Sequence, residues 1–313
     1  MGALLACALT VNAQTLAERL GYKATDRLLI INADDAGMNH GANAAIINVL
    51  ENGIATSSTI MAPCPWFKEF AEYARYFKNP AKSLGVHLTF NSEWENYRFG
   101  PISRETETDG LVDPEGYLWS SAKATFAHAS PMAILIEGRA QIERCLKAGI
   151  DISHLDSHIG TIYDPRYVEI YLQLAKEYNL PVRLPSQEMM ARNNASDIRK
   201  KFTEAGILMC DHIVHHTQES FIDPDHNVKK KWMETIKHLR PGVNDLFIHP
   251  NLLTDEAKAI MDRPTTAEVW GSKGRAIEAE LFLNDPDLIK LIKEEGIILI
   301  SYRQLRDVQR AKE

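Results

Sequence analysis

Short apolar runs alternate with amphipathic helical patterns along this chain from Arg27 onward, and this alternation is what most restricts the folds open to it. Strands that alternate with helices form parallel βαβ units. Eight such units favour an α/β fold with a closed or nearly closed β/α barrel. The runs predicted as strands are Arg27–Asn32, Ser57–Met61, Leu84–Leu88, Ile152–Leu155, Val182–Leu184, His212–Val214, Leu246–Ile248 and Ile297–Ile300.

Helices between these runs are indicated by apolar residues at three- and four-residue steps. In one of them, Leu135, Ile142 and Leu146 share a face before Gly149. Pro131 stands where this helix begins, since proline is favoured in the first helical turn. We therefore predict a helix that begins at Pro131 and presents these three side chains to the core.

Composition places the chain among ordinary globular proteins, with 313 residues, 45% of them hydrophobic and 25% charged. An α/β barrel commonly uses this length in one domain, so we expect a single domain over residues 14–313. The net charge is −7 and the basic residues form no block, which argues against a nucleic-acid partner. The four cysteines form no CxxC pair, so neither a zinc knuckle nor a redox motif is indicated.

The N-terminal residues 1–13 form a candidate signal segment. Residues 2–11 are apolar, and Val11-Asn12-Ala13 resembles the small-residue site before signal cleavage, although no Lys or Arg precedes the run. We predict export to the periplasm or the exterior, with an incidental apolar tail on a cytoplasmic enzyme as the alternative. The run is too short to span a bilayer and no other run approaches that length, so no membrane span is predicted.

Polar motifs follow three of the predicted strands. Asp34 and Asp35 follow the first strand, His87 lies near the end of the third, and Asp156 and His158 follow the fourth. Barrel active sites lie at the carboxyl ends of the strands. One carboxylate with two imidazoles can bind a divalent metal and leave positions open for water, and a second carboxylate beside the first can accept a proton. The combination predicts metal-assisted hydrolysis.

Each of these motifs taken alone has a simpler interpretation. The pair Asp34 and Asp35 is by itself more typical of a helix N-cap, and a lone His87 is more often a satisfied core or surface histidine. Asp156 can orient a neighbouring imidazole through that ring's second nitrogen. His154 is predicted to have a structural role, or to support a ligand from behind, rather than to bind the metal. The occurrence of all the motifs together favours the metal site.

Two further residues are candidates for the same rim. His249 ends a buried apolar run before a proline turn and fits a general acid near neutral pH; a histidine bonded to loop carbonyls is the alternative. Arg183 lies in the fifth predicted strand and needs a partner if buried, with Asp34 or a substrate oxygen as candidates. His215 and His216 follow the sixth strand without a ligand spacing that indicates metal binding.

One connection, residues 91–130, is exceptionally long for a barrel loop. Structureless loops of this length are usually functional or disordered, and disordered segments are poor in aromatic residues. We therefore expect an ordered lid or wall. Trp94 and Tyr97 suit the apolar face of a sugar ring, although for any single ring anchoring the loop to the barrel is the alternative. The aromatic residues of this insertion are Trp94, Tyr97, Phe99, Tyr117, Trp119 and Phe126.

Other hydrolytic and nucleotide-binding classes are not indicated. The chain has no Gly-x-Ser-x-Gly elbow, no Walker pattern, and no Gly-x-Gly-x-x-Gly after a predicted strand. A paired-carboxylate glycosidase would use two of Asp34, Asp35 and Glu93. That mechanism would leave the histidines at the strand ends unexplained.

The chain resembles the YdjC-type carbohydrate deacetylases, the group that includes chitooligosaccharide deacetylase. The resemblance covers most of the chain after Arg27 and implies a single distorted β/α barrel similar to polysaccharide deacetylases, in a homodimer. The segments that carry it are Leu29–Gly37, Thr56–Thr59, Leu84–Thr89, His154–His158, Phe247–Pro250 and Arg275–Leu281.

The resemblance also implies roles for individual residues. Asp35, His87 and His158 would bind one divalent metal ion, with zinc and magnesium favoured among the ions that accept mixed oxygen and nitrogen ligands. Asp34 would be the base and His249 the acid in a hydrolase that acts on a linear amide bond. The implied substrate is an N-acetylated sugar or oligosaccharide, which would lose its acetyl group.

Two alternatives stay open at this point. One is another metal-dependent hydrolase on the same barrel, which cleaves an ester or a non-acetyl amide. The other is a carbohydrate-binding homologue that kept the barrel and lost turnover. Acetate release from N-acetylated oligosaccharides distinguishes the first, and bound metal without hydrolysis of any acylated sugar would favour the second.

Overall fold

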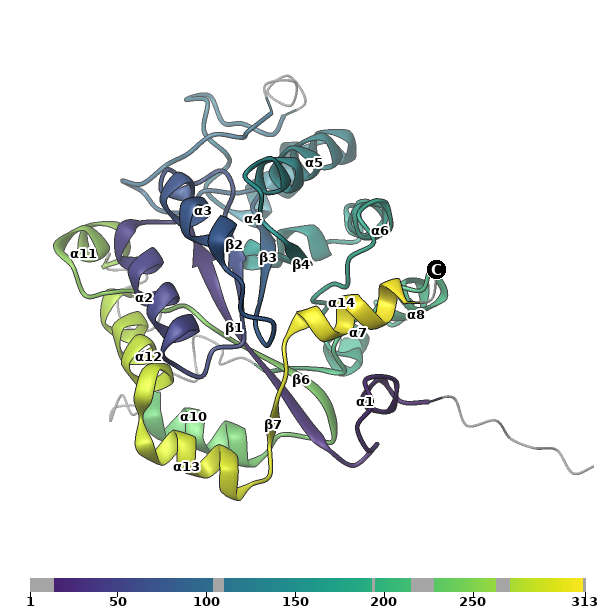
Figure 1. Ribbon diagram of the computed structural model, residues 1–313. Coiled ribbons are helices and arrows are strands. Elements are labelled where there is room, and N and C mark those ends of the chain that lie inside the picture. The colour runs from purple at the N-terminus through teal and green to yellow at the C-terminus, as the bar shows by residue number, and fades with distance from the viewer. Residues whose placement is uncertain (1–13, 104–109, 193–194, 215–227, 263–270, 312–313) are drawn as a thin grey trace, which may run out of the picture.

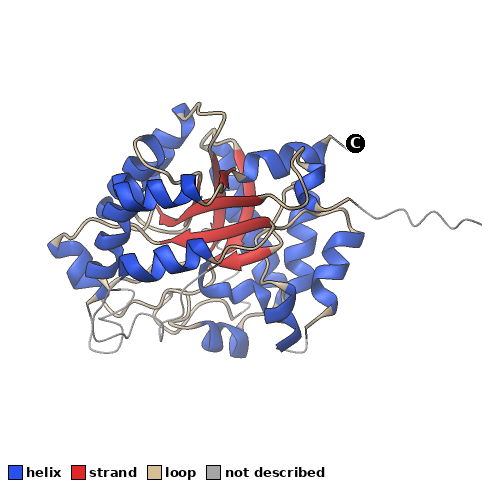
Figure 2. Cartoon of the chain, turned by 90° about the horizontal axis from the view of Figure 1, so that it is seen from below, coloured by secondary structure: helices blue, strands red, loops and turns tan. Residues whose placement is uncertain are grey.

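A parallel sheet lies at the centre of the computed structural model, and helices enclose it (Figure 1 and Figure 2). The structure describes residues 14–103, 110–192, 195–214, 228–262 and 271–311, so the candidate signal segment, His215 and His216 lie outside the described residues. Among the described helices, none is long and apolar enough to cross a membrane.

The sheet is built from strands that follow the predicted runs closely. β1 continues past Asn32 to Ala36, so Asp34 and Asp35 lie within its last residues rather than after it. β4 likewise extends to Ser157, and β7 has only two residues. The strands are β1 (Arg27–Ala36), β2 (Ser57–Ile60), β3 (Ser83–Leu88), β4 (Ile152–Ser157), β5 (His212–Val214), β6 (Gly242–Ile248) and β7 (Ile298–Leu299).

Helices connect successive strands along most of the chain, as the alternating pattern predicts. The helices that precede β4 are α1 (Leu16–Arg19), α2 (His40–Glu51), α3 (Phe67–Tyr76), α4 (Ala122–His128) and α5 (Pro131–Lys147). After β4 come a 3-10 segment η2 (His158–Tyr163) and the helices α6 (Val168–Glu177), α7 (Gln187–Arg192), α8 (Asp197–Glu204), α10 (Val228–Lys237), α11 (Asp255–Met261), α12 (Ser272–Asn284), α13 (Pro286–Glu294) and α14 (Tyr302–Arg310).

The strand order is β4-β3-β2-β1-β6-β5, with every pair parallel, and β7 joins β1 outside this path. One edge of β1 pairs with β6 over residues 27–33. The other edge is divided, because residues 28–29 pair with β7 and residues 32–36 pair with β2. β1 therefore has three partners in the sheet.

The fifth predicted strand, Val182–Leu184, is wrong as a regular strand. Val182 alone forms a bridge, to β4 on one side and to Met209 on the other. Pro181 and Pro185 flank the segment, and proline has no N–H to donate to a ladder. The sheet therefore curls into a half-barrel whose ladder is interrupted between β4 and β5. The α/β barrel class is confirmed in this distorted form.

Helix α5 tests the predicted helical pattern. It begins at Pro131 as predicted, and Leu135 and Ile142 are buried. Leu146 is 42% exposed, so its prediction as a core residue is wrong. Cys145 takes the buried position in the last turn, and Leu146 is rotated by about 100° from it.

The described parts of the insertion are ordered, and Phe99, Leu111 and Leu118 belong to the same buried cluster as the apolar residues of the strands. Phe99 and Leu118 are buried, and the backbone of Leu118 donates to the carbonyl of Phe99 over 3.0 Å. The ring of Trp119 stacks on His128 with 4.1 Å between centroids. These contacts fit the ordered wall that the aromatic content predicts.

The contrast within α5 gives a stability test. We expect Ile142→Ala to lower the free energy of unfolding by about 2–5 kcal/mol, because it leaves a cavity in the core. Leu146→Ala is the matched control and should change it by less than about 1 kcal/mol, since half of that side chain's environment is water. Urea unfolding followed by circular dichroism measures both; equal losses would contradict the burial described here.

Candidate metal centre

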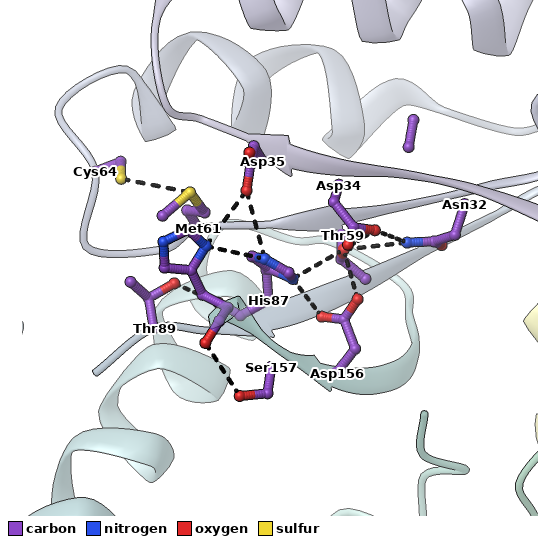
Figure 3. Close-up of polar contacts among 12 residues, drawn as sticks. Asn32, Asp34, Asp35, Thr59, Met61, Cys64, His87, Thr89, Asp156 and Ser157 are labelled. Atoms are coloured by element: carbon purple, nitrogen blue, oxygen red, sulfur yellow. Dashed lines mark hydrogen bonds and ion pairs between the residues drawn. The ribbon is translucent and has the colours of Figure 1, made fainter. Parts of the chain in front are cut away.

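Both aspartates of β1 reach the carboxyl end of the sheet because the backbone leaves the extended conformation between them. Asp35 has a φ of 70°, in the left-handed region that non-glycine residues rarely adopt. Asp35 therefore points toward the ring of His87, whereas Asp34 points toward Asn32 and Thr59 (Figure 3). The N-cap of α2 is Asn39, so the simpler interpretation of the aspartates as caps of that helix is wrong.

Asp35, His87 and His158 come together in a buried triangle, although they are far apart in the sequence. The Asp35 Oδ1 atom lies 3.4 Å from His87 Nε2 and 3.5 Å from His158 Nδ1. The two imidazole nitrogens lie 3.3 Å from each other. This is the set of residues that the family resemblance implies as ligands, and its geometry can hold a metal ion.

The outer nitrogen of each imidazole faces a carboxylate. His87 Nδ1 lies 2.6 Å from Asp156 Oδ1, which is the orienting contact predicted for Asp156. His158 Nε2 lies 2.9 Å and 3.0 Å from the two oxygens of Glu93. A neutral imidazole in this setting keeps its proton on the nitrogen that faces the carboxylate. The lone pairs of His87 Nε2 and His158 Nδ1 then point into the triangle.

These lone pairs meet a third acceptor, since Asp35 Oδ1 is buried and receives no well-aligned hydrogen bond from the described residues. Three electron-pair donors that face one another without a proton need a cation between them. Burial lowers the pKa of both histidines, but Asp156 and Glu93 outweigh it and raise the pKa of His87 to about 10 and that of His158 to about 9. The site thus favours positive charge, from protons or from a metal.

A second group of residues that could hold a metal ion lies beside the triangle, but an arginine already occupies it. Asp34, His87 and Asp156 also offer atoms within 4.8 Å of one another. Arg183 Nη1, however, lies 2.8 Å from an oxygen of Asp34 and 2.8 Å from an oxygen of Asp156. The guanidinium neutralises the two carboxylates of this second group. The triangle of Asp35, His87 and His158 is therefore the better metal site.

Arg183 is the buried hub of this second group. It contacts Asp34, one of the two partners considered for it, and its Nε also lies 2.8 Å from Asp245. Burial raises the pKa of Asp34 to about 6 even though Arg183 opposes the shift. Asp34 is therefore a carboxylate at neutral pH, held in a fixed orientation.

His249 lies close enough to the triangle for its charge state to depend on it. Burial holds the pKa of His249 well below its usual range, with Asp35 opposing and Arg275 reinforcing that effect. Its backbone N–H donates to Glu278 over 2.7 Å. The imidazole of His249 is therefore neutral in the protein without metal or substrate. It would act as an acid only after it receives a proton.

Three contributors to this site were not predicted as site residues from the sequence. Glu93 appeared only as a glycosidase candidate, and Glu278 was not considered. Arg275 lies in a segment that carries the family resemblance, and its Nη1 is 2.7 Å from Asp35 Oδ2. Burial alone raises the pKa of Asp35, but Arg275 and the imidazoles outweigh it and hold that pKa well below its usual range.

The insertion contributes aromatic rings beside the triangle. The Trp94 ring lies 5.6 Å from that of His158 and 5.7 Å from that of Tyr97. The Tyr97 hydroxyl donates to the carbonyl oxygen of Met38, in the turn after β1. Both rings thus anchor the insertion at the site, which is the alternative considered for single aromatic residues of this loop.

Two residues near the ligands show how the local backbone is constrained. Ile159, directly after His158, has a φ of 51°, and a β-branched residue in this region carries strain of about 1–3 kcal/mol. The ring of His154 stacks on Tyr302 with 3.7 Å between centroids, and among the described residues His154 belongs to neither group that could hold a metal ion. These observations fit the structural or supporting role predicted for it.

The fold and the site together define an α/β-barrel protein with a buried carboxylate–imidazole centre suited to one divalent cation. The chain belongs to the YdjC-like protein family, whose model matches residues 28–294. The match includes every residue of the triangle, and the resemblance noted from the sequence motifs is confirmed.

Similar proteins cover nearly the whole chain. A carbohydrate deacetylase of Brevibacillus brevis is 33% identical over 277 residues, which are 88% of this chain and 99% of that protein. A carbohydrate deacetylase of Thermoanaerobacter pseudethanolicus is 26% identical over 280 residues, 90% of this chain and 100% of that protein. A crystal structure from Enterococcus faecalis, described as that of a candidate cellobiose-phosphate cleavage protein, has a TM-score of 0.70 and 25% identity, and covers 90% of this chain and 99% of that one.

The contact between Asp156 and His87 predicts an effect on metal affinity. We expect Asp156→Asn to weaken zinc binding about 10–100-fold, because the imidazole loses the carboxylate that orients it and increases its basicity. Competition with a chromophoric chelator measures the dissociation constant. Asp151→Asn, just before the opposite end of β4 and 58% exposed at the side chain, is the control and should bind zinc normally. Unchanged affinity in Asp156→Asn would contradict the orienting role.

Proposed function

We propose that this protein is a metal-dependent carbohydrate deacetylase, which hydrolyses the acetamide of an N-acetylated sugar or oligosaccharide. The observation that carries the proposal is the convergence of Asp35 Oδ1, His87 Nε2 and His158 Nδ1 on one point, with Asp34 beside them. Membership of the YdjC-like family and the names of its relatives support the substrate class.

Zinc is the ion that this triangle favours. The three ligand atoms lie 3.3, 3.4 and 3.5 Å from one another, close enough to contact one ion together. Two imidazoles also suit zinc better than magnesium, which prefers oxygen ligands. Three protein ligands leave a fourth position for water or substrate.

Asp35, His87 and His158 would hold the divalent ion, which would polarise the substrate carbonyl and lower the pKa of a bound water. The chain's own residues supply the proton transfers. Asp34, ionised near neutral pH and held by Arg183, accepts the proton of the attacking water. His249 is neutral, so it takes up a proton from solvent water and delivers it to the nitrogen of the leaving amine as the amide C–N bond breaks, while Asp34 returns the proton of the attacking water to solvent.

The aromatic residues fit the substrate class. Trp94 and Tyr97 lie beside His158 on the insertion, where their faces can contact the apolar face of a sugar ring. We propose that the single catalytic domain comprises residues 14–313 and includes the insertion over residues 91–130. A large buried hydrophobic cluster with members from Leu29 to Ile297 supports this, and a smaller second cluster includes Ala17, Leu28 and Leu305.

Two statements about the cellular form complete the proposal. The family resemblance supports a homodimer, which light scattering after size exclusion measures as twice the chain mass. The apolar residues 2–11 support export, which fractionation of cells that express the full chain tests directly. A monomeric mass would contradict the homodimer. Protein found only in the cytoplasm would contradict export.

Acetate release is the direct test of the activity. We expect the zinc-loaded protein to release acetate from N-acetylglucosamine oligosaccharides, a chelator to stop release, and added zinc to restore it. Release from acetyl esters or from other amides alone would instead indicate a different hydrolase on this barrel. Stoichiometric zinc with no hydrolysis of any acylated sugar would indicate a binding protein.

The role of Asp34 is tested separately. Asp34→Asn should lower kcat by about 10²–10⁴-fold, since the asparagine side chain cannot accept the proton of the attacking water. The variant should still bind zinc. Zinc content by elemental analysis and kcat by acetate release are measured on the same sample. Asp255→Asn, at an exposed position on α11, should keep the wild-type kcat. Full activity in Asp34→Asn would show that another group is the base.

A further inference from the structure

The two carboxylates that orient the metal ligands belong to different parts of the fold. Asp156 lies in β4 and is fully buried. Glu93 lies in the insertion, and its side chain is 25% exposed. One imidazole is thus oriented by the sheet and the other by a loop, so the centre is complete only when the loop is docked.

Glu93 is held in place by a closed ring of contacts, three between side chains and one to the backbone carbonyl of His158. Asn91 Nδ2 donates to Glu93 Oε2 over 3.0 Å, and Thr161 Oγ1 donates to Asn91 Oδ1 over 2.8 Å. Thr161 in turn lies in η2, three residues after His158, and its hydroxyl contacts the His158 carbonyl at 3.3 Å. The insertion is therefore joined to the segment that carries His158 by two contacts, one from Glu93 to the imidazole and one from Asn91 to Thr161.

The next residue of the insertion contacts the same imidazole. The Trp94 ring lies 5.6 Å from the His158 ring, at an interplanar angle of 37°. Tyr97 packs on Trp94 and is fixed to the turn after β1 through Met38. A displacement of this part of the insertion would remove the acceptor from His158 Nε2 and the ring that packs on it together.

We propose that Glu93 is a positioning residue that couples the docked insertion to the metal centre. In the docked insertion, Glu93 contacts His158 Nε2 and so fixes the ring with Nδ1 facing Asp35 and His87. Because coupling between two equilibria is reciprocal, a bound metal must also stabilise the docked insertion. The proposal depends on the metal triangle and not on which acyl sugar the protein hydrolyses.

Zinc affinity tests the coupling without any measurement of activity. We expect zinc to bind about 10-fold more weakly to Glu93→Gln, which keeps an acceptor oxygen but loses the charge, and about 100-fold more weakly to Glu93→Ala. Glu115→Gln removes an exposed carboxylate from the same insertion and is the matched control, with wild-type affinity expected. The graded order separates orientation of the imidazole from general loss of structure, which would not follow the acceptor strength.

Hydrogen exchange over residues 91–99 provides the second readout. Zinc should slow exchange in this segment of the wild-type protein and should have little effect on it in Glu93→Ala, while the metal-free melting temperatures agree. If Glu93→Ala does not fold, the isosteric Glu93→Gln decides through its zinc affinity. Equal affinity across the variants, or full zinc protection in Glu93→Ala, would overturn the proposal. Wild-type protein that binds no zinc would overturn both this proposal and the metal triangle.

Discussion

The arrangement of protons on two histidines is the constraint on which the rest of this structure depends. Asp156 and Glu93 each take the outer N–H of one imidazole, and the inner nitrogens are left facing a carboxylate oxygen that has no donor of its own among the described residues. A protein interior does not tolerate such a set of acceptors without a positive charge. Protons or a divalent metal ion can supply that charge, and the proposed chemistry depends on a metal ion at this position.

Two backbone irregularities of the barrel lie at the residues of the triangle. β1 shares one edge between β7 and β2, and its register shifts between Ala33 and Ala36, where Asp35 adopts a left-handed conformation. That local departure turns Asp35 toward the imidazoles and leaves Asp34 on the Arg183 side. Ile159 shows a second departure directly after His158. Strain of this kind persists only where surrounding contacts fix the backbone, as the buried ion pairs do here.

The sequence predicts the parts of this protein that repeat with a regular period or follow a strand. The β/α alternation identified seven strands, and the polar residues after them identified the triangle, because parallel strands bring their carboxyl ends to one edge. It could not predict that Val182 forms only two isolated bridges in place of a strand, because these depend on partners distant in the chain. Nor could it place Glu93 or Arg275, whose contacts with His158 and Asp35 depend on how a loop and a late helix fold back.

X-ray absorption at the zinc edge of the fully loaded protein tests the central claim most directly. The account predicts one zinc per chain, with four light-atom ligands at about 2.0–2.1 Å and the multiple scattering of two imidazoles. Removal of either histidine of the triangle should reduce that scattering to one imidazole. A spectrum without imidazole scattering, or one dominated by sulfur at about 2.3 Å, would show that the ion binds elsewhere and would contradict the account.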